Sequence, residues 1–218
     1  MLLEYRAVEP RVRTPQPPLL LLLHGIGADE NDLLPLAQFL DPRFLILAVR
    51  APHEAAAMGY GWYEIDWTVT PARADPAEMV ASRNLLARFV EEAIATYGTD
   101  RARTYLLGFS QGAIMSIALL LARPDLVRGV VAHSGRLARL AGQLDPATEA
   151  FSRAEVLVLH GAQDEVVPVA DGRKVAAVLG KLLGPRLTYQ EYVSLGHGIS
   201  DESLADAARW LTARLDRP

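Results

Sequence analysis

The stretch Thr104-Tyr105-Leu106-Leu107-Gly108-Phe109-Ser110-Gln111-Gly112 decides how this chain folds. Its last five residues match the pattern Gly-x-Ser-x-Gly, which presents a nucleophilic serine when it follows a strand and opens a helix. The apolar run 103–107 predicts such a strand, and the segment 111–122 predicts such a helix. The flanking glycines let neighbouring backbone approach the turn, so the Ser110 hydroxyl would be held out at the strand end. The alternative is an ordinary glycine-rich turn in which Ser110 only caps the helix.

Outward from this stretch, short apolar runs alternate with helical patterns along the whole chain. The continuous apolar runs predict strands covered on both faces, at 19–23, 44–49, 103–107, 126–132 and 155–159, and a more alternating strand nearer an edge at 187–193. The helical patterns predict helices at 30–40, 76–97, 111–122, 169–183 and 200–215. This order predicts an α/β fold in which helices flank both faces of a mostly parallel central sheet. We expect a single domain over residues 1–218, without a large lid domain.

The composition excludes several classes of protein. Half of the 218 residues are apolar and the net charge is −4, which excludes intrinsic disorder. The absence of cysteine excludes disulfide scaffolds, thiolate metal sites and a cysteine nucleophile. A pI near 5.7 disfavours general nucleic-acid binding. No run approaches the roughly 20 apolar residues of a membrane-spanning helix, and no leader segment is recognisable, so we expect a cytoplasmic protein.

A serine nucleophile needs a base, and the base needs an orienting acid. In folds with a serine turn of this kind, the order along the chain is serine, then the acid, then the histidine. Of the five histidines, only His197, in a Gly-His-Gly turn, follows a plausible acid placed after Ser110. The acid that we expect is Asp164, in the loop after a predicted strand. The weaker candidates for the acid are Glu165 and Asp171.

The same chemistry needs main-chain N–H donors that face the oxyanion of the tetrahedral intermediate. One donor should belong to Gln111, the residue after the nucleophile, and the other to a loop after an earlier strand. The loop Leu23-His24-Gly25-Ile26-Gly27 offers the Ile26 N–H, because its glycines let the chain turn. Since both donors are main-chain groups, we expect the side chains of Ile26 and Gln111 to be weakly constrained. His24 is expected to form structural hydrogen bonds.

The connection 51–75 is long and rich in aromatic residues, which is typical of a functional segment or of small added elements. It holds three candidate substrate-binding residues, Met58, Trp62 and Tyr63, with Tyr60 and Trp67 beside them. Local packing of these rings is an equally good interpretation. No metal-binding motif is present and no phosphate-binding glycine motif is complete, so we expect neither a metal nor a cofactor.

Four blocks of sequence resemble, in this order, those of one enzyme family. They are 23–33 (LHGIGADENDL), 108–113 (GFSQGA), 160–168 (HGAQDEVVP) and 196–200 (GHGIS). Over nearly its whole length the chain resembles the carboxylesterase and acyl-protein thioesterase family of α/β-hydrolases, also called the phospholipase/carboxylesterase family. The resemblance implies an α/β-hydrolase fold with a set of catalytic residues: Ser110 as nucleophile, Asp164 as acid, His197 as base, and the amides of Ile26 and Gln111 as oxyanion donors. Leucine is frequent in the family at position 26, and glycine at position 113.

The residues and the resemblance predict the same function. We expect a serine carboxylesterase that hydrolyses short- to medium-chain carboxylic esters through an acyl-enzyme, with a small-molecule ester as its partner. An acyl-protein thioesterase or a lysophospholipase acting on longer acyl chains is the first alternative. A peptidase or acyltransferase with the same machinery, and a non-catalytic protein that binds a small ligand, are the others. The sequence leaves the oligomeric state open, with a homodimer as one alternative.

Overall fold

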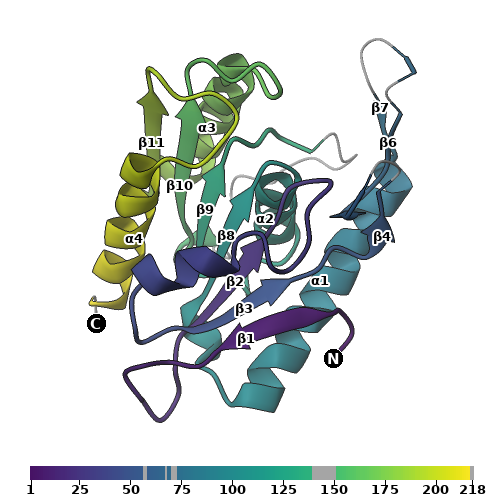
Figure 1. Ribbon diagram of the computed structural model, residues 1–218. Helices are drawn as coiled ribbons and strands as arrows, with labels where there is room; N and C mark the ends of the chain where they lie inside the picture. Colours follow the sequence, from purple (N-terminus) through teal and green to yellow (C-terminus); the bar gives the residue numbers. More distant parts are fainter. Residues whose placement is uncertain (56–57, 67, 70–72, 139–150, 217–218) are drawn as a thin grey trace.

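The fold is described from a computed structural model that places residues 1–55, 58–66, 68–69, 73–138 and 151–216. Seven strands form one sheet in the order β1-β3-β2-β8-β9-β10-β11 (Figure 1). The pairings from β3 through to β11 are parallel, and β1 pairs antiparallel with β3 at one edge. The predicted α/β fold with a mostly parallel central sheet is therefore confirmed.

The strands and helices lie close to the predicted ranges. The strands of the sheet are β1 (Tyr5–Val8), β2 (Leu19–Leu23), β3 (Leu45–Val49), β8 (Thr104–Phe109), β9 (Gly129–His133), β10 (Glu155–Gly161) and β11 (Leu187–Tyr192). The helices are α1 (Pro76–Tyr97), α2 (Gln111–Ala122), α3 (Val169–Leu183) and α4 (Asp201–Leu215), with the 3-10 helices η1 (Leu34–Phe39), η2 (Arg101–Arg103) and η4 (Gly184–Arg186). Two small two-stranded sheets join β4 (His53–Glu54) to β5 (Tyr60–Gly61) and β6 (Ile65–Asp66) to β7 (Arg73–Ala74).

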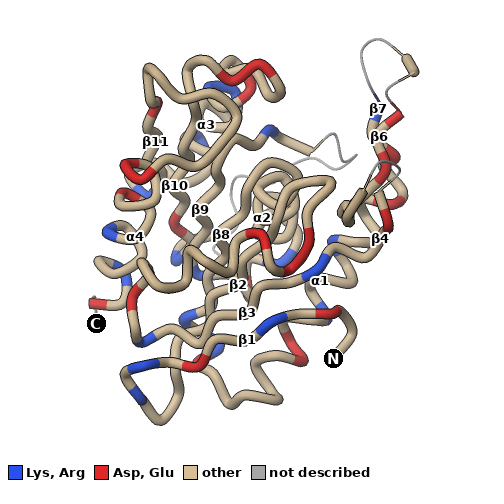
Figure 2. Tube along the Cα trace, viewed as in Figure 1, with Lys and Arg blue, Asp and Glu red and all other residues tan. Residues whose placement is uncertain are grey.

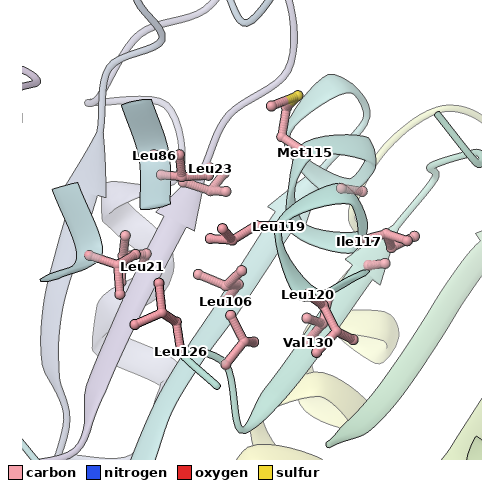
Figure 3. Packing of buried hydrophobic residues seen from close by; sticks show 14 of the residues in the cluster. Leu21, Leu23, Leu86, Leu106, Met115, Ile117, Leu119, Leu120, Leu126 and Val130 are labelled. Atoms are coloured by element: carbon pink, nitrogen blue, oxygen red, sulfur yellow. The ribbon is translucent and has the colours of Figure 1, made fainter. Parts of the chain in front are cut away.

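The five leucines of β2 show why the sheet is covered on both faces. Side chains alternate across a strand. Leu19, Leu21 and Leu23 belong to one buried cluster, and Leu20 and Leu22 belong to the other. The helices α1, α2 and α3 cover the first cluster, part of which is drawn in Figure 3, and α4 and η1 cover the second. Each fully buried leucine contributes about 1.5–3 kcal/mol of transfer free energy, so a five-residue apolar run in mid-sheet specifies this strand strongly.

The helix next to the expected catalytic histidine begins at a fixed residue. The Ser200 side chain accepts a hydrogen bond from the Ser203 N–H at 3.1 Å, and the Ser200 N–H donates to the Ser203 hydroxyl at 2.9 Å. This reciprocal pair satisfies two N–H groups at the start of α4. The turn that carries His197 therefore leads into a helix with a well-defined first turn.

The predicted helix over 30–40 is wrong in its first half. Residues 30–33 form turns, and the regular element is the short 3-10 helix η1, with a proline at its start. Glu30 is buried to 3% exposure, and its carboxylate accepts a hydrogen bond from Arg50 at 2.6 Å. This ion pair joins the buried Glu30 carboxylate to the residue that follows β3, so Glu30 does not face solvent as it would on a surface helix.

Two further features were not predicted as elements. The strand β1 and the short strands of the connection 51–75 are each two to four residues long, which leaves little periodic signal to detect.

The alternating segment at 187–193 does form an edge strand, β11, as predicted. No helix among the described residues is long and apolar enough to cross a membrane.

Candidate active site

Ser110 lies in the turn between β8 and α2, in a backbone conformation that L-residues rarely adopt (φ 53°, ψ −117°). Such a conformation costs about 1–3 kcal/mol and persists only where its surroundings impose it. A Cβ on Gly112 would lie 1.9 Å from the Leu23 carbonyl oxygen, and a Cβ on Gly108 would lie 2.3 Å from that of Gly112. Both glycines of the motif are therefore required by close backbone packing, and the predicted strand–turn–helix elbow is present.

A continuous line of hydrogen bonds joins three loops at this end of the sheet. The Nε2 atom of His197 lies 3.0 Å from the Ser110 hydroxyl oxygen, and its Nδ1 atom lies 2.8 Å from Oδ2 of Asp164. The side chain of His197 is 17% exposed, whereas that of Asp164 is fully buried. With Nδ1–H donated to the carboxylate, Nε2 is free to accept the serine proton. Ser110, Asp164 and His197 are thus brought together in the geometry of a base-activated nucleophile.

The carboxylate of Asp164 is held from both sides. Its Oδ1 atom accepts hydrogen bonds from the N–H groups of Val166 at 3.0 Å and Val167 at 2.7 Å. Burial opposes ionisation, but the hydrogen bonds from His197 and from these two amides outweigh it and lower the pKa of Asp164. His160 lies behind the carboxylate, with its Nε2 atom 2.8 Å from the Val167 carbonyl oxygen. Asp164 is therefore an ionised, oriented group at neutral pH.

The two weaker candidates for the acid lie elsewhere. Asp171 is in the first turn of α3, where its carboxylate pairs with Lys174 at 3.1 Å. Glu165 has an exposed side chain. Neither carboxylate contacts His197 within the part of the chain that the structure describes. The geometry therefore favours Asp164 among the three.

The two expected oxyanion donors have no competing acceptor in the described part of the chain. Among the described residues, neither the Ile26 N–H nor the Gln111 N–H donates a hydrogen bond to another group. Gln111 is the first residue of α2, where N–H groups have no partner within the helix. The loop of Ile26 is anchored by His24, whose ring is buried and accepts a hydrogen bond from the Ala51 N–H at 3.0 Å. His24 thus forms structural hydrogen bonds, as predicted, and burial lowers its pKa, which keeps the ring neutral.

The expectation that the Gln111 side chain is weakly constrained is wrong. Gln111 is 2% exposed. Its Oε1 atom accepts a hydrogen bond from the Trp62 N–H, and its Nε2 atom donates one to the Tyr63 carbonyl oxygen, each at 2.8 Å. Both partners belong to the aromatic connection 51–75, so the side chain fastens that connection to the nucleophile elbow. Ile26, at 36% exposure, has the freedom that was expected.

A cavity of about 310 Å³ opens beside the loop 23–27, which we call the oxyanion loop after the donor expected in it. Ile26, Met58 and Tyr63 line it, so two of the three candidate substrate-binding residues face this space. Trp62 is not part of this lining; its ring is fully buried, and its indole N–H donates a hydrogen bond to the His24 carbonyl oxygen at 3.0 Å. Trp67 lies outside the described residues.

Two glutamates, Glu54 and Glu64, also line this cavity. Both side chains are exposed, and neither forms an ion pair with a described cation. Figure 2 shows acidic positions gathered along the segment that carries β4, β6 and the start of α1. The lining of the cavity therefore combines apolar side chains, such as those of Ile26 and Met58, with two acidic ones.

A second serine–histidine pair lies at the end of the neighbouring strand β9. His133 is 2% exposed, and its two ring nitrogens lie 3.1 Å from the Ser134 hydroxyl and 2.9 Å from the Ser203 hydroxyl. Burial lowers the pKa of His133 to about 3, so the ring is neutral. No local sequence pattern indicates this network, because its members are up to 70 positions apart. No cluster of side chains that could hold a metal ion is found among the described residues.

A family profile described as Phospholipase/Carboxylesterase matches residues 4–215. The chain belongs to this family. As a family member it is a carboxylic ester hydrolase with an α/β-hydrolase fold, in agreement with the sequence resemblance.

Individual relatives support the same assignment. The putative hydrolase MhqD of Bacillus subtilis is 32% identical over 115 residues, which cover 53% of this chain and 56% of that protein. Acyl-protein thioesterase 1 of Eremothecium gossypii is 26% identical over 209 residues, which cover 90% of this chain and 87% of that protein. The crystal structure of esterase PE8 is 28% identical and superposes with a TM-score of 0.79, covering 97% of this chain and 98% of that one. The alignment with the first relative thus spans about half of its length, and the other two span most of theirs.

Proposed function

We propose that this chain hydrolyses carboxylic esters through an acyl-enzyme formed on Ser110. The observation that carries the proposal is the continuous line of hydrogen bonds from Ser110 through His197 to Asp164. A hydroxyl is a weak nucleophile near neutral pH, and a neutral imidazole at 3.0 Å can remove its proton as it attacks. We assign Ser110 as nucleophile, His197 as base and Asp164 as the acid that orients the base.

In the first half of the reaction, Ser110 Oγ forms a bond to the ester carbonyl carbon while His197 Nε2 accepts its proton. The carbonyl oxygen becomes an oxyanion, to which the N–H groups of Ile26 and Gln111 would donate. The carbon–oxygen bond to the alcohol then breaks, and His197 gives its proton to the departing oxygen. Water repeats the sequence on the acyl-enzyme, which releases the carboxylic acid and restores the serine.

The preferred substrates are proposed to be short- to medium-chain esters. The cavity beside the oxyanion loop, at about 310 Å³, is near the lower end of the range of about 300–1,000 Å³ typical of ligand pockets. Its wall includes Met58 and Tyr63, which we propose as contacts of the substrate. Trp62 is proposed to act on the substrate only through the loops that it holds, because its ring is buried behind the oxyanion loop.

The second candidate is activity on longer acyl chains, as a thioesterase or lysophospholipase. Its support is the similarity over 90% of this chain to a protein named acyl-protein thioesterase 1. The catalytic steps are the same for an ester and a thioester, so the catalytic residues do not separate the two candidates. The length of the acyl chain that gives the highest kcat/KM separates them.

The test is steady-state hydrolysis of p-nitrophenyl esters from acetyl to palmitoyl. The wild type should turn over the short and medium esters best, and Ser110→Ala should lose about 10⁴-fold or more in kcat. Ser134→Ala is the matched control, because Ser134 also contacts a histidine and has a positive φ of 55°. It should retain activity within about twofold, since it has no carboxylate-backed base.

Each outcome of this series has a defined meaning. A maximum at the palmitoyl ester, or faster cleavage of matched thioesters, would favour the second candidate. A folded wild type that binds esters without turning them over would contradict hydrolysis and favour a ligand-binding protein. Equal losses in Ser110→Ala and Ser134→Ala would contradict the assignment of Ser110 as nucleophile.

A further inference from the structure

The Gln111 side chain joins the nucleophile elbow to one short segment of the aromatic connection. Its amide uses both functions on adjacent main-chain groups, accepting from the Trp62 N–H and donating to the Tyr63 carbonyl oxygen. Both hydrogen bonds are 2.8 Å long and buried. A Cβ on Gly61 would lie 3.4 Å from Gln111 Oε1, so the backbone of the segment is in close contact with this amide. We call residues Tyr60 to Tyr63 the bridging segment.

The bridging segment also forms hydrogen bonds with the loop that carries the other oxyanion donor, Ile26. The Gly27 N–H donates to the Tyr60 carbonyl oxygen at 2.9 Å, and the Tyr60 N–H donates to the Ala28 carbonyl oxygen at 2.7 Å. The Trp62 indole N–H donates to the His24 carbonyl oxygen at 3.0 Å. These hydrogen bonds hold the chain on both sides of Ile26.

We propose that the Gln111 side chain and Trp62 are positioning residues that set the distance between the two oxyanion donors. The proposal rests on the proposed function, in which the amides of Ile26 and Gln111 bind the oxyanion. Gln111 then has two roles: its N–H is one donor, and its side chain, acting through the bridging segment, fixes the loop of the other. Trp62 completes the connection by its indole hydrogen bond to that loop.

The physical consequence is specific to the transition state. Two N–H groups on separate loops stabilise an oxyanion only when both lie at hydrogen-bond distance from the same point. The charge on that oxygen develops during the reaction, so a small displacement of one donor weakens transition-state binding and leaves ground-state binding almost unchanged. Loss of the connection should therefore lower kcat and leave KM nearly constant.

A purely structural role for the same hydrogen bonds gives a different expectation. The Trp62 N–H and the Tyr63 carbonyl are buried, so the Gln111 amide also removes the cost of leaving them unpaired. If that were its whole contribution, a variant would unfold at a lower temperature, while its folded fraction would keep the affinity for a transition-state analogue. The affinity for an oxyanion analogue, measured on folded protein, separates the two roles.

The experiment uses two variants that keep both main-chain donors. Gln111→Met retains the length of the side chain and removes both hydrogen bonds, and Trp62→Phe retains a buried ring and removes only the indole hydrogen bond. The control is Trp210→Phe, which makes the same replacement at a buried tryptophan of α4 whose indole nitrogen has no hydrogen-bond partner among the residues that the structure describes. Trp210 belongs to the cluster on the opposite face of the sheet from Trp62.

Three quantities are measured on each folded protein: kcat, KM for p-nitrophenyl butyrate, and Ki for a butyl trifluoromethyl ketone. Ser110 Oγ forms a bond to the carbonyl carbon of the ketone while its proton passes to His197 Nε2, and the carbonyl oxygen becomes the oxyanion. Removing one oxyanion donor entirely costs about 10²–10³ in kcat, so displacing one should cost about 10-fold to 100-fold in Gln111→Met and about 3-fold to 10-fold in Trp62→Phe. KM should stay within about twofold, and Ki should rise by the factor by which kcat/KM falls.

The outcomes separate this inference from the proposed function. If the wild type hydrolyses the ester and binds the ketone, but both variants keep the wild-type Ki, the inference is overturned and the proposed function stands. An equal effect of Trp210→Phe would also overturn it, because any lost tryptophan would then suffice. If Gln111→Met does not fold, Trp62→Phe alone decides. If the wild type neither hydrolyses the ester nor binds the ketone, the proposed function itself fails.

Discussion

Two neighbouring strands of the sheet each end in a serine that contacts a histidine, but only one pair has the properties of a catalytic site. Ser110 follows β8 and Ser134 follows β9, and both have positive φ values, of 53° and 55°. Each hydroxyl lies about the same distance from an imidazole nitrogen, 3.0 Å for Ser110 and 3.1 Å for Ser134. Contact between serine and histidine therefore does not distinguish a nucleophile from a structural serine in this protein.

The two pairs differ in the group that contacts the second ring nitrogen of the histidine and in how far the histidine is exposed to solvent. His197 has Asp164 on its second nitrogen and is 17% exposed, whereas His133 has the Ser203 hydroxyl there and is 2% exposed. An imidazole backed by a carboxylate can carry the positive charge that forms during proton transfer. His133 cannot do so cheaply, since burial holds its pKa at about 3. A carboxylate partner and access to solvent are the two properties that distinguish Ser110 and His197, the pair that we propose as catalytic and call the active pair.

The largest expected effect comes from removing the carboxylate from the active pair. Asp164→Asn should lower kcat by about 10³–10⁴-fold, because an amide no longer fixes the imidazole tautomer or stabilises the imidazolium. The measurement is kcat for the butyrate ester at pH 8. Asp171→Asn is the matched control, since Asp171 is the other aspartate of this region and pairs with Lys174. It should stay within about twofold of the wild type, and a larger loss there than in Asp164→Asn would contradict the choice of acid.

The features of the active pair that could be predicted from the sequence are those encoded in short, local patterns. The Gly-x-Ser-x-Gly pattern, the five-leucine run of β2 and the Gly-His-Gly turn each have a local meaning, so the elbow, the central strand and the position of His197 could be predicted. The acid was predicted from its order along the chain, and Asp164 lies within hydrogen-bond distance of a histidine 33 positions away.

The rest depends on contacts between residues that are distant in the sequence. The side chain of Gln111 meets main-chain groups 48 and 49 positions earlier, and nothing in the motif itself indicates which groups these are. The network of His133 requires Ser203, which is 70 positions later. The local pattern places Glu30 in a helix, because its pairing with Arg50 is visible only once β3 is in place.

The buried pair of His133 and Ser134 should make the stability of the protein depend on pH. The pKa of His133 is lowered to about 3, from about 6.5 in the unfolded chain. Its contribution to stability is therefore complete above about pH 6.5 and is lost as the pH falls toward 3, because the unfolded chain binds a proton that the folded protein does not. The loss should approach about 1.4 kcal/mol per pH unit in the middle of this window.

The measurement is urea unfolding of the wild type and of His133→Asn between pH 7 and pH 4. The variant should be less stable at pH 7, since it loses a hydrogen bond to a serine, and the difference in unfolding free energy should shrink as the pH falls. A difference that stays constant across this range would show that His133 takes up its proton as readily in the folded protein as in the unfolded chain.

The smallest expected effect is on the selectivity between negatively charged and neutral ester substrates. Glu54 and Glu64 place two negative charges in the lining of the cavity beside the oxyanion loop, so an ester with a free carboxylate should be disfavoured there. Because both side chains are exposed and screened by solvent, the double change to glutamine should raise kcat/KM for p-nitrophenyl hemisuccinate only about 2-fold to 4-fold relative to the neutral butyrate ester at low salt.

At about 1 M salt the gain should vanish, since the Debye length falls to about 3 Å. Glu9→Gln, which removes an exposed charge that does not line the cavity, should leave the ratio unchanged. A gain that persists at high salt would mean that the glutamates act by shape, and selectivity would then have to be sought in the apolar wall formed by Ile26 and Met58.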